Sequence, residues 1–399
     1  MRGKTTISNK SLCVLAAMVF CSGCAGIPSG TRGDAVVVSE YRVRTGDGWT
    51  LELKRYRLGD GERLSPPWGE PLPIILCHGL ACNGRIWDLG EDISLARYLA
   101  GDGYDVWVPS LRGSGRSTKP AVSAWREALI LKWPEPAQLF NCPTLSEPEK
   151  FNWNFDDHVL KDLPAIIDAV KAKSGHSQVM WVGLSMGGMV MYGYLEKTDR
   201  DDVAAFVAVS SAIAIPQPPG KMYRRALHNR NLILIGRTLF NIQGPSTIGA
   251  LTGWLPGEET RWNVANINPA AVRPVYRNAM EDVSSGLLLQ LASLAQTGHL
   301  KSADGAFDYT GELHRVKAPI LCMVGSMDTV CDPAGVRYAY EHVGSRDKNY
   351  VELGRAYGFS ADYGHVDTVL GRNSRREVYP IIRNWLATHT TSAYPASSR

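Results

Sequence analysis

Two hydrophobic patterns alternate along most of this chain. Short apolar runs typical of strands are separated by stretches in which apolar residues recur every three to four positions, the spacing of a helix. In the first half, the predicted strands are residues 36–43, 50–56, 72–77, 104–108, 178–182 and 203–209. The predicted helices are residues 87–102, 158–174 and 187–195. This alternation predicts a largely parallel sheet with helices on both faces.

The second of these helices has a continuous apolar stripe. Its members are Leu160, Leu163, Ile166, Ile167 and Val170. Their spacing predicts that one face of the helix packs against the sheet.

The alternation breaks between residues 215 and 313. That stretch has scattered Pro and Gly and no clear strand, and helical spacing is confined to residues 224–240 and 287–294. Alternation then resumes, with predicted strands at 320–324 and 349–353 and predicted helices at about 333–343 and 375–387. Because both ends of the irregular stretch return to one sheet, we predict a helical cap inserted into the core. The alternative is an independent domain.

The first residues have the pattern of a signal peptide. Basic residues up to Lys10 are followed by a short apolar run and then by Cys21-Ser22-Gly23-Cys24. The run is shorter than the roughly 20 residues that span a bilayer. Ser22-Gly23-Cys24 resembles the end of a bacterial lipobox, although Cys21 stands where Leu is usual. We therefore expect export and lipidation of Cys24. The alternatives are export without a lipid and, for the apolar run, a buried helix.

These patterns divide the chain into segments. We predict a signal peptide at 1–23, a tether at 24–33, core segments at 34–214 and 314–390, the cap at 215–313 and a flexible C-terminus at 391–399. The chain has 399 residues, 44% of them hydrophobic, enough for a large core. Its net charge is only +4 and it has no block of Lys or Arg, so nothing indicates nucleic-acid binding.

The cysteines matter because export implies an oxidising compartment. Cys77 and Cys322 lie in apolar strand-like runs and are expected to be buried. Cys82, Cys142 and Cys331 could form a disulfide, but the sequence leaves the pairing open. No Cys or His spacing suggests a metal site.

One pentapeptide carries the main chemical signal. Gly183-Leu184-Ser185-Met186-Gly187 follows a predicted strand and precedes a predicted helix. That context is typical of a nucleophile elbow, in which glycines allow a sharp turn that exposes the serine hydroxyl. A glycine-rich turn with a capping serine is the alternative. We predict that Ser185 is a nucleophile.

A serine nucleophile needs a base that is oriented by an acid, in the chain order Ser, Asp or Glu, then His. Asp328 follows a predicted strand and is the predicted acid, whereas Asp332 is better placed to cap a helix. His365 lies in a loop after the last strand and is the predicted base. His342 lies within a predicted helix and His389 lies beyond the last one, so both fit less well.

The oxyanion of such a reaction needs two N–H donors. We predict the backbone N–H groups of Leu80, in the turn after strand 72–77, and of Met186, at the start of the helix. His78 is expected to shape its loop rather than to act as the base.

With these motifs the chain resembles the acid-lipase branch, the gastric and lysosomal lipases, of the α/β-hydrolases. The matching stretches are His78-Gly79-Leu80, Gly103-Tyr104-Asp105-Val106-Trp107, Asp162-Leu163-Pro164-Ala165, the elbow, Asp328 with Asp332-Pro333, and Gly364-His365-Val366-Asp367. The resemblance implies the α/β-hydrolase fold and hydrolysis of lipid esters by Ser185, His365 and Asp328. It departs at Leu184, where those lipases carry His, at Met186-Gly187-Gly188, and throughout the cap.

The predicted function is that of an exported serine hydrolase of lipid or acyl esters, anchored in the cell envelope through Cys24. No cofactor or metal is required. An acyltransferase or a thioesterase could use the same triad, and a non-catalytic binding protein could use the same scaffold. A dehalogenase or an epoxide hydrolase would need a carboxylate in place of Ser185. Apolar residues of the cap and of residues 119–153 suit an acyl chain or a buried structural face equally well.

Overall fold

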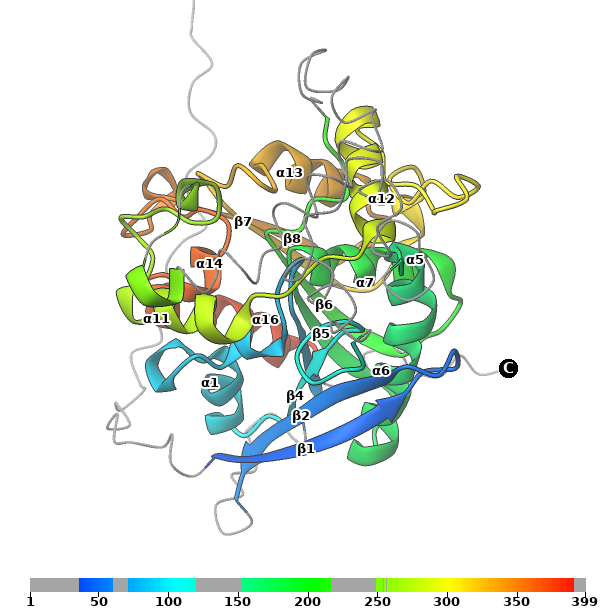
Figure 1. Cartoon of the computed structure of the whole chain (residues 1–399), viewed down its shortest axis with the longest axis horizontal. Helices are drawn as coiled ribbons and strands as arrows, with labels where there is room; N and C mark the ends of the chain where they lie inside the picture. Colours follow the sequence, from blue (N-terminus) through cyan, green and yellow to red (C-terminus); the bar gives the residue numbers. More distant parts are fainter. Residues whose placement is uncertain are drawn as a thin grey trace, which may run out of the picture. The chain divides into compact units, whose positions relative to one another are not determined.

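A mixed sheet of eight strands lies at the centre of the fold (Figure 1). The computed structural model describes residues 36–59, 71–119, 152–216, 249–253, 255 and 257–390. The strand order is β1-β2-β4-β3-β5-β6-β7-β8. The bounds are β1 Val36–Arg44, β2 Thr50–Leu58, β3 Ile74–Cys77, β4 Val106–Ser110, β5 Val179–Leu184, β6 Val203–Val209, β7 Ile320–Gly325 and β8 Lys348–Leu353. The predicted signal peptide, tether, C-terminal segment and Cys24 lie outside the described residues.

The pairing of the strands sets their directions. β2 pairs antiparallel with β1 and with β4, whereas all pairs from β4 through β3 to β8 are parallel. β3 begins two residues later than predicted, at Ile74, because Pro73 has no N–H for the ladder. The largely parallel sheet predicted from the sequence is confirmed.

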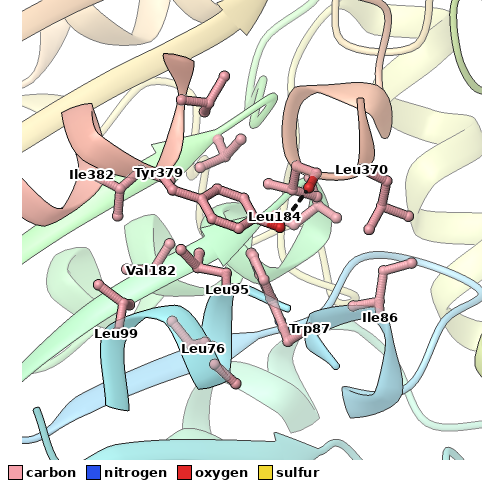
Figure 2. Close-up of a cluster of buried hydrophobic side chains, with 14 of the residues drawn as sticks. Leu76, Ile86, Trp87, Leu95, Leu99, Val182, Leu184, Leu370, Tyr379 and Ile382 are labelled. Carbon is pink, nitrogen blue, oxygen red and sulfur yellow. Dashed lines mark hydrogen bonds between the residues drawn. The ribbon is translucent and has the colours of Figure 1, made fainter. Parts of the chain in front are cut away.

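One face of the sheet is covered by α1 (Leu95–Gly101) and α16 (Tyr379–Thr388). In Figure 2, side chains from β3 and β5 point toward those of the two helices. The labelled residues from these elements are Leu76, Val182, Leu184, Leu95, Leu99, Tyr379 and Ile382. The Tyr379 hydroxyl donates a hydrogen bond of 2.9 Å to the Val369 carbonyl, so its one polar group is satisfied within this apolar layer.

The other face is covered by α6 (Leu163–Ser174), α7 (Met186–Lys197) and α13 (Pro333–His342). The predicted stripe is buried from Leu163 onward, but Leu160 is 45% exposed. Leu160 belongs to η4 (His158–Asp162), a π-helical turn that precedes α6. A π-turn adds a residue to one helical turn and so rotates the earlier side chains away from the stripe.

Two predicted helices are shorter or interrupted. In place of helix 87–102, η2 (Gly84–Trp87) and η3 (Glu91–Ile93) are short 3₁₀ turns, and the α-helix begins only after Ser94. The Ser94 hydroxyl accepts a hydrogen bond of 3.0 Å from the Arg97 N–H, a typical N-cap that fixes this start. The last predicted helix is divided at Val378 into α15 (Ser374–Glu377) and α16.

A helical segment connects β6 to β7, at the place predicted for the cap. Its described elements are η5 (Glu258–Thr260), α11 (Pro269–Pro274), η6 (Val275–Ala279), α12 (Ser285–Thr297) and η7 (Leu313–Arg315). Helix 287–294 is confirmed within α12, whereas the predicted helix 224–240 lies outside the described residues. Across the described ranges, no helix has the length and apolar character needed to cross a membrane.

Candidate active site

Ser185 lies in the turn between β5 and α7. Its backbone angles, φ 53° and ψ −120°, fall in a region that residues with a side chain rarely adopt. The Ser185 N–H donates to the Val209 carbonyl (2.8 Å), and the Ser185 carbonyl accepts from the Gly188 N–H (2.9 Å). Neighbouring strand β6 and helix α7 therefore hold this strained conformation, which is common at functional sites.

The flanking glycines are needed because the backbones approach closely. A Cβ added at Gly183 would lie 2.3 Å from the backbone of Gly187. A Cβ at Gly187 would lie 2.3 Å from the Cys77 carbonyl oxygen of β3. No larger residue fits either position without movement of the backbone, which explains the spacing of the glycines in the motif.

Asp328 and His365 are in direct contact. Asp328 Oδ2 lies 2.8 Å from His365 Nδ1, and both residues are buried. Asp328 Oδ1 accepts two hydrogen bonds of 2.9 Å, from the N–H groups of Val330 and Cys331. Since the carboxylate accepts the Nδ1 proton, His365 Nε2 is left as the basic nitrogen.

The loop that carries His365 is fixed by a second carboxylate, Asp367. Asp367 is fully buried and accepts hydrogen bonds from the N–H groups of Gly364 (3.0 Å) and Asn263 (3.1 Å) and from the Asn266 side chain (2.8 Å). Burial raises the pKa of Asp367, although these bonds oppose the rise. The carbonyl of His365 also accepts from the Thr368 hydroxyl, at 2.8 Å.

The three predicted triad residues follow β5, β7 and β8. These strands are parallel, so the loops after them meet at one edge of the sheet. Ser210, directly after β6, links the loops: its hydroxyl donates to the His365 carbonyl (3.2 Å), and the preceding Val209 receives the Ser185 N–H. The structure thus places Asp328 and His365 in contact at the sheet edge that also carries Ser185, while the catalytic roles of all three stay predictions.

The loop after β3 lies against the elbow. A Cβ added at Gly79 would lie 3.1 Å from the Ser185 Cβ. His78 Nε2 accepts from the Leu111 N–H (3.0 Å), and its Nδ1 donates to the Gly79 carbonyl (2.9 Å). Burial lowers the pKa of His78 to about 4, which keeps the ring neutral at pH 7. This geometry agrees with the predicted loop-shaping role of His78.

The two predicted oxyanion donors directly follow the residues that approach each other: Leu80 follows Gly79, and Met186 follows Ser185. Leu80 continues the loop, and Met186 is the first residue of α7, where a backbone N–H has no partner within its helix. Their roles as donors are proposals.

The rival candidates have structural roles. Asp332 caps α13, accepting from the Gly335 N–H at 2.7 Å. His342 ends the same helix, and His389, which follows α16, pairs with Asp347 (3.0 Å).

Cys331 is a site neighbour that the sequence analysis did not identify. Burial raises the pKa of its thiol, and a hydrogen bond with the Ser185 side chain opposes the rise. Cys82 and Cys331 are free thiols, Cys77 and Cys322 are buried as expected, and Cys142 lies outside the described residues. No sequence motif places Cys331 near Ser185, so only the three-dimensional structure reveals that the two residues are neighbours.

The segment between β6 and β7 contacts both site loops. The Asn83 N–H donates to the Ala279 carbonyl (3.0 Å) beside the loop that carries Leu80, and the Val366 N–H donates to the Arg261 carbonyl (2.9 Å). Throughout the residues that the structure describes, no group of His, Cys, Asp and Glu is arranged to hold a metal ion.

Comparisons with known proteins find one matching family model and several lipases. A family model described as serine aminopeptidase, S33, matches residues 74–357. Human lipase member K is 22% identical over 378 residues, which cover 85% of each protein. Human gastric triacylglycerol lipase is 29% identical over 202 residues, covering 50% of this chain and 44% of that lipase. The chain spans only about a third of the length of several other lipases that it matches.

Among solved structures, an esterase from Thermogutta terrifontis superposes with a TM-score of 0.53 and 18% identity. The superposition covers 88% of this chain and all of the esterase. At this identity the likeness concerns the fold alone, and it supports the α/β-hydrolase fold.

Proposed function

Because the chain belongs to the serine aminopeptidase S33 family of α/β-hydrolases, we propose that it hydrolyses carboxylic esters, with Ser185 as nucleophile, His365 as base and Asp328 as acid. The observation that carries this proposal is the buried Asp328–His365 contact at the sheet edge where the strained Ser185 lies. The relatives reported above are lipases by name, which favours a lipid or acyl ester over a peptide bond.

The proposed reaction has two steps. His365 Nε2 takes the Ser185 proton while Ser185 Oγ attacks the ester carbonyl, and the N–H groups of Leu80 and Met186 stabilise the oxyanion. His365 then donates the proton to the leaving alcohol. A water molecule repeats the sequence on the acyl-enzyme and releases the acid. Asp328 holds His365 in the required tautomer and stabilises its protonated form.

The same triad would also serve acyl transfer or thioester hydrolysis. These activities differ from ester hydrolysis only in the acceptor or in the leaving group. A binding protein without activity on a hydrolase scaffold is the remaining alternative. The segment 215–313 is proposed to form a cap over the site, because its described part contacts the loops beside Leu80 and His365.

The test is hydrolysis of p-nitrophenyl esters from acetate to palmitate by the mature protein and by Ser185→Ala. We expect activity that disappears in the variant, with the preferred chain length separating a lipase from a short-chain esterase. Ser210→Ala is the matched control, since Ser210 also follows a strand and also has a positive φ, 48°. The activity of Ser210→Ala should fall by less than about tenfold, because the substitution removes one hydrogen bond. Cleavage of alanine p-nitroanilide but of no ester would instead indicate a peptidase.

Export and lipid anchoring are proposed from the sequence of residues 1–24. Cys24→Ala should move the protein from the detergent phase to the aqueous phase of a Triton X-114 partition if Cys24 carries the lipid. An unchanged distribution would contradict the anchor and leave the ester-hydrolase proposal unaffected.

A further inference from the structure

The residue that follows Leu80 has a strained backbone. Ala81 has a φ of 57°, in the left-handed region that residues with a Cβ rarely adopt. Such a conformation persists only where the surrounding structure holds it. The Glu281 N–H, from the segment between β6 and β7, donates to the Ala81 carbonyl at 2.9 Å. The strain therefore lies one residue from the proposed oxyanion donor and is held by that segment.

The same segment contacts the next two residues of the loop. Cys82 and Met280 form an isolated antiparallel β-bridge. The Asn83 N–H donates to the Ala279 carbonyl at 3.0 Å. Together with the hydrogen bond to Ala81, these contacts join three consecutive residues of the loop to three consecutive residues of the segment, as in a pair of short strands.

The Glu281 side chain adds a buried carboxylate to this pairing. Glu281 is 5% exposed and Asn83 is 3% exposed. Glu281 Oε1 accepts from the Asn83 side-chain amide (2.8 Å) and from the Gly115 N–H (2.8 Å), and Oε2 accepts from the Lys119 ammonium (2.7 Å). Because a buried carboxylate is stable only with such partners, it fixes the end of the Leu80 loop against the loop after β4.

The first half of the Leu80 loop is held from another side. His78 Nδ1 donates to the Gly79 carbonyl at 2.9 Å, and Gly79 packs against Ser185. The Gly79 carbonyl and the Leu80 N–H belong to one planar peptide unit and point in opposite directions. The core thus orients this peptide, while residues 279–281 hold the residues directly after it.

We propose that Glu281 is a positioning residue that, through Asn83 and Ala81, holds the loop in the conformation in which the Leu80 N–H reaches the oxyanion. This inference rests on the proposed ester hydrolysis at Ser185. It goes beyond that function because it makes stabilisation of the oxyanion depend on a contact from the segment between β6 and β7. Loss of the contact should weaken binding of the transition state more than binding of the ester.

The first test removes the carboxylate. Glu281→Ala deletes its three hydrogen bonds, whereas Glu281→Gln keeps an acceptor oxygen at the same place. Glu258→Ala is the matched control. Glu258 is 4% exposed and lies in the same segment, but its side chain accepts from the Leu255 N–H (2.9 Å) and the Tyr276 hydroxyl (2.6 Å), both within that segment.

The second test removes the donor instead and does not depend on the folding of Glu281→Ala. Asn83→Asp keeps an oxygen for the Arg85 N–H (2.9 Å), so the turn remains capped. It removes the amide that donates to Glu281 and to the Asn278 carbonyl (2.9 Å). Combining Asn83→Asp with Glu281→Gln returns a donor to this contact and should recover part of the loss.

The measurements are kcat and KM for p-nitrophenyl butyrate and the inhibition constant of an alkyl trifluoromethyl ketone. When Ser185 Oγ adds to the ketone carbon, its proton passes to His365 and the carbonyl oxygen becomes an oxyanion. The inhibitor therefore needs the same N–H donors as the reaction. Titration with a fluorophosphonate counts the folded sites, so misfolded protein does not alter the constants.

We expect Glu281→Ala and Asn83→Asp to lower kcat about 10- to 100-fold, less than the roughly 10²–10³-fold cost of losing an oxyanion donor outright. KM should change less than about threefold, and the inhibition constant should rise by the factor by which kcat/KM falls. Glu281→Gln and Glu258→Ala should stay within about threefold of the wild type.

Two results would overturn the inference: a rise in KM with kcat unchanged, or equal losses in Glu281→Ala and Glu258→Ala. A wild type that hydrolyses no ester would overturn the proposed function and this inference with it.

Discussion

Two buried histidine–aspartate pairs, His365 with Asp328 and His158 with Asp162, have nearly the same local geometry and very different surroundings. In each, Nδ1 lies 2.8 Å from a carboxylate Oδ2. Asp328 receives two backbone N–H groups, and within the described residues its only ion-pair partner is His365. Asp162 is already paired with Arg112. The charge of Asp328 is therefore available to stabilise a protonated His365, whereas that of Asp162 is compensated.

The positions of the two pairs also differ. Asp328 and His365 lie on separate loops at the sheet edge next to the elbow. His158 and Asp162 lie four residues apart on one helical turn, and their partner Arg112 connects them to the turn after β1. The comparison indicates that a histidine–carboxylate contact does not define a catalytic site by itself. What matters as well is whether the carboxylate is already neutralised.

The largest effect should come from the proposed acid. Asp328→Asn should lower kcat/KM for a simple ester by about 10⁴-fold with little change in stability, because His365 would lose the partner that sets its tautomer. Asp332→Asn is the matched control, four residues along, since Asn also caps helices well. Equal losses in both variants, in steady-state assays with p-nitrophenyl butyrate, would contradict the assignment.

Asp162→Asn should act on stability instead. It removes the carboxylate that His158 contacts and one of the two that pair with the buried Arg112, so the free energy of unfolding should fall by up to about 3–5 kcal/mol. Asp168→Asn, which breaks an exposed pair with Arg200, should cost no more than about 1 kcal/mol. Urea unfolding followed by tryptophan fluorescence measures both. If Asp162→Asn abolished ester hydrolysis while stability was unchanged, the contrast between the two pairs would be wrong.

A third buried histidine, His78, has no carboxylate within hydrogen-bond distance among the described residues, and burial dominates its pKa. Its pKa is about 4 in the folded protein against 6.5 ordinarily, so the unfolded chain binds the extra proton first as the pH falls. Stability should therefore decrease between about pH 7 and pH 4, by up to about 3 kcal/mol from this group. His78→Asn should be less stable at pH 7 but show a flatter pH dependence in urea unfolding. Parallel curves for the two proteins would refute this.

The smallest effect should come from the anchoring of the His365 loop. Thr368→Val removes the 2.8 Å hydrogen bond to the His365 carbonyl and should cost about 1 kcal/mol of stability. This loss of stability is measured by calorimetry as a decrease in the temperature of half-unfolding. Thr297→Val, which removes only exposed hydrogen bonds, to Ser293 and His299 at the end of α12, should change it less. A larger shift for Thr297→Val would show that this loop is not held in the way described.

Periodic parts of the chain were predictable from the sequence because local spacing determines them. β6 and the buried stripe of α6 from Leu163 lie where the apolar pattern predicts. The elbow was predictable for a related reason: the glycine spacing reflects close backbone contacts that tolerate no side chain.

Features that depend on tertiary contacts were not predictable. The π-turn that exposes Leu160 also aligns His158 with Asp162, and no periodic signal marks it. The Cys331–Ser185 contact joins residues 146 positions apart. The contacts of the irregular segment with Asn83 and Val366 arise only once β6 and β7 are neighbours.

The central claim is that His365 and Asp328 activate Ser185. It is tested most directly by labelling the folded protein with a fluorophosphonate probe and mapping the modified peptide by mass spectrometry. We predict a single label on Ser185, with a labelling rate that falls at least about 10³-fold in Asp328→Asn but remains near that of the wild type in Asp332→Asn. A label on another serine, or an Asp328→Asn variant that reacts as fast as the wild type, would contradict the account.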